Sequence, residues 1–171
     1  PGNLYYHFRN KDDIIEHLFG RYEERIDAAL GAPTDRLPGL EDIWLLLHLV
    51  FECIWDYRFL YRDLADILSR NRRLRIRFAR ILRRADEQAH DVMRGLSQAG
   101  VMRASAAELD AAATNVLVIA TFWMNYASAR GDKDEQVSIR AGIVQVMMLL
   151  APFLRDAERV HLNTLTRAYI D

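Results

Sequence analysis

The amino-acid sequence predicts an all-α protein. Apolar residues recur with a period of about 3.6 along most of the chain, and the alternation typical of strands is nearly absent. The chain has 171 residues, of which 51% are hydrophobic and 27% are charged. That composition is sufficient for one globular unit with a complete core, with at most a small appendage.

Turn and capping residues divide the chain into helices. We expect helices at about 11–30, 41–56, 61–69, 72–99 and 106–130, a last long helix from 132–135 to about 154, and a short terminal helix at 156–169. Ser105 and Glu108 have the spacing of a capping box, and Gly100 and Gly131 are expected to end the helices that precede them. Pro152 removes a backbone donor and should end or kink the last long helix.

The Pro/Gly-rich stretch at 31–39 is the main linker in the sequence. It predicts two regions. Residues 1–30 would be the C-terminal part of a DNA-binding unit plus a connecting helix, and residues 40–171 would be a helical effector-binding and dimerisation domain.

The N-terminal segment combines turn residues with a cluster of aromatic side chains. Leu4 and Phe8 are four residues apart and share one helix face, whereas Asn3, Tyr6 and His7 lie on another. A short helix of this kind can pack one face on a core and present polar groups to a DNA groove.

The residues that follow are suited to the start of a new helix. Asn10 is a good N-cap, and Asp12 and Asp13 suit the positive end of the helix dipole. Lys11 at the same helix start could bind a phosphate group.

The run 4–11, LYYHFRNK, resembles position for position the end of the recognition helix and the start of the next helix in the TetR family of transcriptional regulators. The resemblance implies base or phosphate contacts from Gly2, Asn3 and Tyr5, and DNA-backbone contacts from Tyr6, His7 and Lys11. The alternative is that the aromatic residues form only a core cluster.

A recognition helix needs a preceding helix that braces it against the DNA backbone. That helix would lie before Pro1. We therefore expect residues 1–171 alone not to bind an operator specifically, and we expect two amphipathic helices to be encoded before Pro1.

The segments 106–130 and 139–150 are apolar on nearly all sides. A helix that is apolar all round must be covered all round, which favours pairing with the same two helices of a second subunit. The resemblance implies the same dimer. The predicted interface residues are Leu117, Ala120, Met124, Ile139, Ile143, Val146, Met147 and Leu150. The alternative is a monomer whose core surrounds both segments.

Several polar or aromatic residues interrupt apolar helix faces, as in a mostly apolar pocket with a few polar groups. Members of the family bind an effector among the helices of the body. The candidate ligand-binding residues are Trp44, His48, Glu52, Trp55, His90, Met93, Trp123 and Tyr126. For each of them alone, an ordinary core or surface role is the competing interpretation.

Arginine residues are dense between positions 70 and 84, and Arg73, Arg77, Arg80 and Arg84 share one helix face. We expect this face to be solvated. The competing interpretation is a second surface for nucleic acid or another anionic partner.

Composition and motifs exclude several other classes. The net charge is −1, so nucleic-acid binding must be local. The single cysteine, Cys53, cannot form an internal disulfide and fits a cytoplasmic location. The apolar stretches are shorter than a bilayer span requires. The histidines lack metal-ligand spacing, and nucleotide-binding and hydrolase motifs are absent, so we expect no metal, no cofactor, no catalytic residue and no enzymatic activity.

These observations favour a cytoplasmic bacterial regulator, a homodimer that binds a double-stranded DNA operator and is released by a small-molecule effector. The helix at 11–30 would be the lever between the reading helix and the body. The alternative is a helical small-molecule-binding or protein-interaction module without DNA binding.

Overall fold

The computed structural model describes residues 11–31, 36–167 and 169. Within these ranges the chain is helical, with a single isolated antiparallel bridge between Met102 and Leu154, so the all-α prediction is confirmed. The elements are α1 (Lys11–Leu30), α2 (Leu40–Asp56), α3 (Arg58–Arg62), α4 (Leu64–Arg70), α5 (Arg72–Gln98), α6 (Ala106–Arg130), α7 (Glu135–Leu150), the 3-10 turn η2 (Ala151–Phe153) and α8 (Asp156–Arg167).

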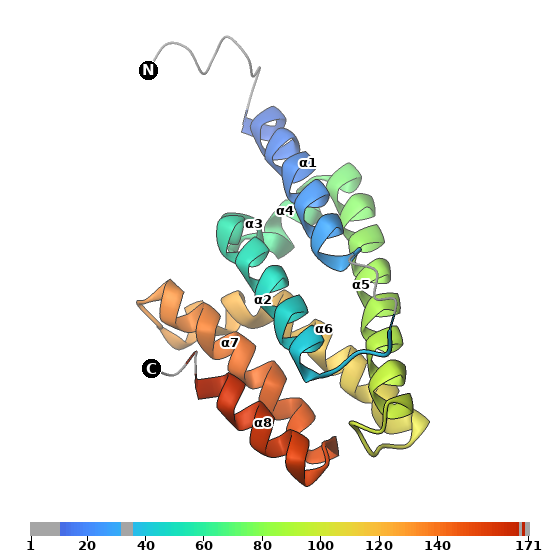
Figure 1. Ribbon diagram of the computed structural model, residues 1–171. Coiled ribbons are helices and arrows are strands. Elements are labelled where there is room, and N and C mark those ends of the chain that lie inside the picture. Colours follow the sequence, from blue (N-terminus) through green and yellow to red (C-terminus); the bar gives the residue numbers. More distant parts are fainter. Residues whose placement is uncertain (1–10, 32–35, 168, 170–171) are drawn as a thin grey trace.

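The helices pack around one continuous core. α1 lies against α2 and α5, α6 bridges α5 and α7, and α8 covers α2 and α7 at the C-terminal end (Figure 1). α1 contributes Phe19, Tyr22 and Ile26 to the same core as the later helices. The described part of the predicted connecting helix is therefore packed into the body, while the predicted boundary at residue 30 remains a prediction.

Local chemistry sets most helix ends where the sequence places them. The Ser105 hydroxyl accepts a hydrogen bond from the Glu108 amide at 3.3 Å, and the Glu108 carboxylate accepts one from the Ser105 amide at 2.7 Å. These bonds lower the pKa of Glu108 and confirm the predicted capping box. Gly100 and Gly131 have φ of 73° and 85°, a conformation that favours glycine after a helix.

Two predicted boundaries are wrong. A helix begins already at Arg58 and is interrupted at Asp63, so the expected short helix at 61–69 is two helices, α3 and α4. The last long helix ends at Leu150 instead of 154, because the chain tightens into η2 around Pro152, which has no amide hydrogen to continue an α-helix.

Close packing at two glycines fixes how the helices approach each other. A Cβ on Gly142 of α7 would lie 2.6 Å from the Phe51 ring and 2.7 Å from the Trp123 ring. A Cβ on Gly95 of α5 would lie 2.6 Å from the Pro38 ring. At both places an ordinary side chain would push neighbouring elements apart.

Candidate functional site

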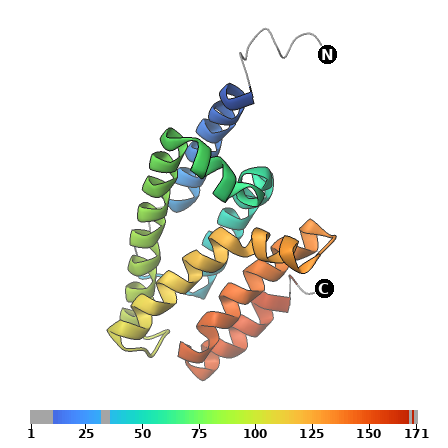
Figure 2. The same ribbon diagram turned by 180° about the vertical axis from the view of Figure 1, so that it is seen from behind.

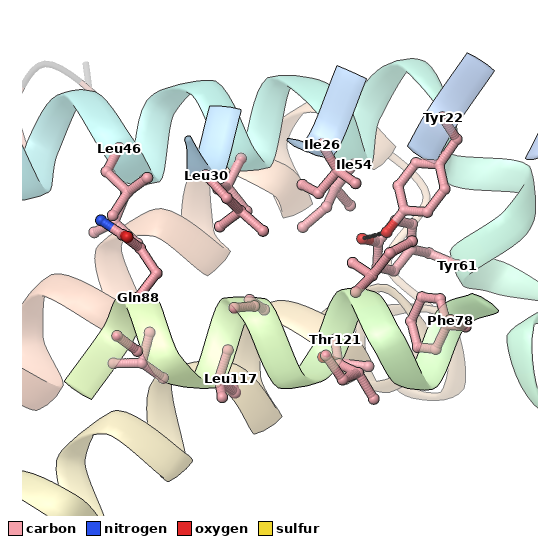
Figure 3. A pocket seen from close by; sticks show the side chains of 18 residues that line it. Tyr22, Ile26, Leu30, Leu46, Ile54, Tyr61, Phe78, Gln88, Leu117 and Thr121 are labelled. Atoms are coloured by element: carbon pink, nitrogen blue, oxygen red, sulfur yellow. Dashed lines mark hydrogen bonds between the residues drawn. The ribbon is translucent and has the colours of Figure 1, made fainter. Parts of the chain in front are cut away.

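A cavity of about 90 Å³, which is partly open to solvent, is enclosed between α1 and α2 on one side and α5 and α6 on the other, with Tyr61 of α3 at one end (Figure 3). Its lining residues are Tyr22, Ile26, Leu30, Leu46, Leu47, Val50, Ile54, Tyr61, Phe78, Ile81, Leu82, Ala85, Gln88, Ala89, Val116, Leu117, Ala120 and Thr121.

Small side chains explain why this space is not filled. Where α5 and α6 face the cavity they present Ala85, Ala89 and Ala120. Alanine leaves room at a helix crossing that a leucine would occupy, and the branched side chains opposite do not reach across it. A void of this kind lacks dispersion contacts on one side, so an apolar ligand that enters gains them.

The polar groups of the cavity lie at its two ends. At one end the hydroxyls of Tyr22 and Tyr61 are hydrogen-bonded at 2.7 Å; at the other lies the amide of Gln88 (Figure 3). Thr121 adds one hydroxyl along the wall. The 18 lining residues include no Asp, Glu, Lys, Arg or His.

The pair formed by Tyr22 and Tyr61, the tyrosine pair, is held rigidly by its neighbours. Phe19 and Tyr57 pack edge-on against Tyr22, with ring centroids 5.4 and 5.6 Å away, and Phe78 packs edge-on against Tyr61 at 6.4 Å. Burial raises the pKa of both phenols well above the usual value, so both hydroxyls keep their hydrogens at neutral pH.

Ion pairs join the other side of α1 to α5. Glu16 pairs with Arg73 at 3.3 Å, Glu23 with Arg77 at 2.6 Å, and Asp27 with Arg84. The pair of Glu23 and Arg77 is the least exposed of the three. α1 is therefore attached to α5 by charge on one face and borders the cavity with another.

These pairs correct the prediction for the arginine run. Arg73, Arg77 and Arg84 do not form a free solvated face, because each bonds a carboxylate of α1 more than fifty residues earlier in the chain. Of the four arginines predicted to share the face, Arg73 and Arg80 are exposed, and Arg77 and Arg84 are partly buried.

None of the eight candidate ligand-binding residues lines the cavity. His48, Glu52 and Trp55 instead line an open groove of about 360 Å³ between α2 and α7, together with Gln136, Ile139, Arg140, Ile143 and Tyr169. We call this the α2–α7 groove. His48 Nδ1 lies 3.2 Å from the Tyr169 hydroxyl, and the Trp44 ring stacks on His48 with centroids 5.7 Å apart.

The remaining candidates are dispersed. His90 bonds the Asp86 carbonyl at 2.8 Å and faces the Asp110 carboxylate at 3.6 Å, while Met93 is in the core. The Trp123 indole donates to the Ser138 carbonyl at 2.5 Å, and Tyr126 is 54% exposed beside Arg130. The structure thus brings His48, Glu52 and Trp55 together at the α2–α7 groove and places the other candidates apart, and the ligand-binding assignments remain predictions.

The predicted dimer residues are mostly inside the subunit. Met124, Ile139, Ile143, Val146, Met147 and Leu150 are all less than 10% exposed because their own chain covers them, so they are not available to a partner. Leu117 and Ala120 line the cavity. The apolar side chains that α6 and α7 do expose are Val118, Phe122, Tyr126, Val137 and Met148.

Among the described residues, one segment, Glu135–Phe153, is long and apolar enough to cross a membrane, judged by length and composition alone. It is 19 residues long with a mean hydropathy of 1.4, and 39% of it is buried inside the subunit. Its buried side packs against α2 and α6, which identifies it as a helix of the core.

The predicted DNA-contacting residues Gly2, Asn3, Tyr5, Tyr6 and His7 lie outside the described residues. The backbone of Lys11 begins α1, and its side chain also falls outside the description. These assignments therefore remain predictions.

The helical architecture of the chain matches a known class of protein. The family model for TetR, described as a bacterial transcriptional repressor, matches residues 21–162. A crystal structure of a TetR-family transcriptional regulator from Marinobacter aquaeolei VT8 is 35% identical, with a TM-score of 0.84, and the match covers 99% of this chain and 82% of that chain. Among curated proteins no relative was found.

The chain therefore belongs to the TetR family and has the fold of its transcriptional regulators. The family membership predicted from the motif at 4–11 is confirmed by the family-model match to residues 21–162, which shares no residue with that motif.

Proposed function

We propose that this protein is a dimeric, effector-released transcriptional repressor whose effector binds in the enclosed cavity. One observation carries the proposal: α1, which follows directly after the predicted DNA-reading residues, also supplies Tyr22, Ile26 and Leu30 to the cavity wall. Occupancy of the cavity and placement of the reading segment thus depend on the same helix.

The size of the cavity indicates how a bound effector would move the helices around it. A void of about 150 Å³ in an engineered core accommodates benzene, whereas this cavity is about 90 Å³. An effector larger than a few atoms has to separate the walls. The α5 wall is part of a 27-residue helix packed against α4 and α6, so α1 is the wall with fewer neighbours to displace.

Displacement of α1 changes the angle at which each subunit presents its reading segment. A dimer recognises two half-sites at a fixed spacing, so a change in that angle lowers operator affinity. The free energy of this loss cannot exceed the difference in the effector's binding free energy between the two body conformations.

The second subunit is proposed to cover the exposed apolar side of α6 and α7. Val118, Phe122 and Tyr126 recur every four residues along α6 and are each more than 50% exposed. In Figure 2, α6 crosses the front of the molecule with no helix over it. The six buried residues that the sequence predicts at the interface lie instead in the core, beneath the exposed side of these two helices.

Two measurements test the proposal. Sedimentation of the wild-type chain should give a dimer at micromolar concentration, and Phe122→Glu should give a monomer, whereas Ala111→Glu, an exposed site nearer the start of α6, should leave the dimer intact. A monomeric wild-type protein contradicts the dimer.

The second measurement is operator binding by the full-length gene product. A DNA fragment selected from random sequence should be bound tightly and released when the cavity is filled. If no fragment is selected, the interpretation as a ligand-binding module without a DNA role replaces this one.

A further inference from the structure

The tyrosine pair at the end of the cavity has one hydrogen-bond donor that the bond between its two hydroxyls does not use. Each phenol has one hydrogen, and the single bond between the two hydroxyls uses one of the two. Neither hydroxyl has another partner within the part of the chain that the structure describes. One donor is therefore left over in a site where Tyr22 is 1% exposed and Tyr61 is 5% exposed.

A buried donor without an acceptor is unfavourable, so a molecule that supplies an acceptor at this place binds more tightly than one that does not. Both hydroxyls point into the same end of the cavity (Figure 3). The edge-on contacts with Phe19, Tyr57 and Phe78 hold the rings in place, so the donor is oriented before a ligand arrives.

The rest of the lining restricts the ligand further. Between the tyrosine pair and Gln88 its walls are apolar apart from the Thr121 hydroxyl, and none of the lining residues is Asp, Glu, Lys, Arg or His. A charged ligand would lose its hydration without gaining a counter-ion.

We infer that the effector is a neutral, elongated, mostly apolar molecule that places a carbonyl or ether oxygen against the hydroxyls of Tyr22 and Tyr61. This inference rests on the proposed function, because it specifies the ligand of the proposed effector cavity. It assigns the tyrosine pair as the specificity determinant, and Gln88 as the polar group nearest the ligand's other end.

Two probes of nearly equal shape test it. Butyrophenone and butylbenzene differ in that one has a carbonyl where the other has a methylene. Their dissociation constants are measured by isothermal titration calorimetry on the wild-type chain and on the double variant Y22F/Y61F. The double variant removes both hydroxyls together, so it leaves no donor unpaired and should keep the fold.

The expected result is a difference between the probes. Butyrophenone should bind the double variant about fivefold to tenfold more weakly than it binds the wild type, since one hydrogen bond is lost. Butylbenzene should bind both proteins equally or bind the variant slightly more tightly. Anionic 4-phenylbutyrate should bind neither protein detectably.

Three other outcomes contradict the inference in distinguishable ways. If the two probes change in parallel on the variant, the tyrosine pair is structural and the acceptor assignment is wrong. If 4-phenylbutyrate binds as well as butyrophenone, the restriction to neutral ligands is wrong. If neither neutral probe binds the wild type, the cavity is not a ligand site, and the proposed function fails together with the inference.

Discussion

The enclosed cavity and the α2–α7 groove lie on two sides of the same helix. Toward α7, α2 is packed so closely that only glycine fits at position 142, and what remains is a shallow surface groove with His48, Glu52 and Arg140 around it. Toward α5 and α6, α2 borders a smaller and less open cavity with mostly apolar walls. Three of the eight residues that suggested a ligand site, His48, Glu52 and Trp55, line the groove, and none of the eight lines the cavity.

The difference shows what makes a binding cavity in a helical protein. Polar and aromatic side chains can interrupt an apolar face wherever that face approaches solvent, so they indicate a surface at least as often as a site. A cavity arises from missing volume, here at Ala85, Ala89 and Ala120. Alanine carries no chemical signature of a ligand, which is why the sequence did not distinguish it from ordinary core packing.

A substitution that fills the cavity should distinguish the cavity from the α2–α7 groove most clearly, because it should weaken ligand binding only if the ligand binds in the cavity. Ala85→Leu places three further carbon atoms in the void, and an overlap of about 3 kcal/mol with a ligand corresponds to about 100-fold weaker binding. Titration of the variant with butyrophenone measures the loss. Gln136→Leu in the groove and Ala111→Leu on the exposed side of α6 should bind like the wild type. A loss with Gln136→Leu and none with Ala85→Leu would reverse the assignment of the two sites.

Overpacking the close contact beneath the α2–α7 groove should lower the stability of the fold and leave ligand binding in the cavity unchanged. Gly142→Ala forces a methyl group against the Phe51 and Trp123 rings, and such overpacking lowers the free energy of unfolding by about 1–3 kcal/mol. For a chain of this size a loss of 1 kcal/mol lowers the melting temperature by about 2–4 °C. Thermal unfolding followed by circular dichroism measures it. An unchanged melting temperature would mean that α2 and α7 are not in close contact.

High pH should lower the free energy of unfolding of the protein. Burial raises the pKa of the Cys53 thiol from 9.0 to about 12, and it raises that of both members of the tyrosine pair above 10.0. The folded chain therefore holds protons that the unfolded chain loses, and this stabilisation is present below pH 9 and lost as pH rises toward 12. Urea unfolding between pH 8 and 12 should show the decline. Cys53→Ala should have a shallower slope, and parallel slopes would contradict the role of the thiol.

The ion pairs on the far side of α1 should have the smallest effect. Glu23→Gln breaks the least exposed of them, to Arg77, and should lower the free energy of unfolding by about 1 kcal/mol, less at high salt. Asp66→Asn, which breaks the exposed pair with Arg70, is the control and should change it by less than about 0.5 kcal/mol. Equal effects of the two substitutions would mean that α1 is not fastened to α5 by charge.

The sequence predicted the parts of the fold that short-range chemistry determines. The capping box at Ser105 and Glu108, and the left-handed glycines 100 and 131, place helix ends within a few residues, and local reasoning is sufficient for them. The break at Asp63 was missed because neither Pro nor Gly marks it. The N-cap of α5, Asn71, which accepts from the Leu74 amide at 3.1 Å, was also missed, although asparagine is a common cap.

Features that depend on distant segments could not be read from the sequence. The sequence predicted an unpaired, solvated face for the arginines of α5, because their carboxylate partners lie on α1, more than fifty residues away in the sequence. α6 and α7 looked apolar on all sides, yet the fold divides each into a face buried in its own subunit and an exposed face. Tyr22 and Tyr61 are separated by 39 residues, so their hydrogen bond, and with it the polar end of the cavity, becomes visible only in the folded chain.

A crystal structure of the protein soaked with 4′-bromobutyrophenone tests most directly whether the cavity is the ligand site, because bromine can be located by its anomalous scattering. The account predicts the ligand between α1, α2, α5 and α6, with its carbonyl oxygen within hydrogen-bonding distance of a hydroxyl of Tyr22 or Tyr61. Ligand density in the groove beside His48 and Tyr169, with the cavity empty, would contradict it.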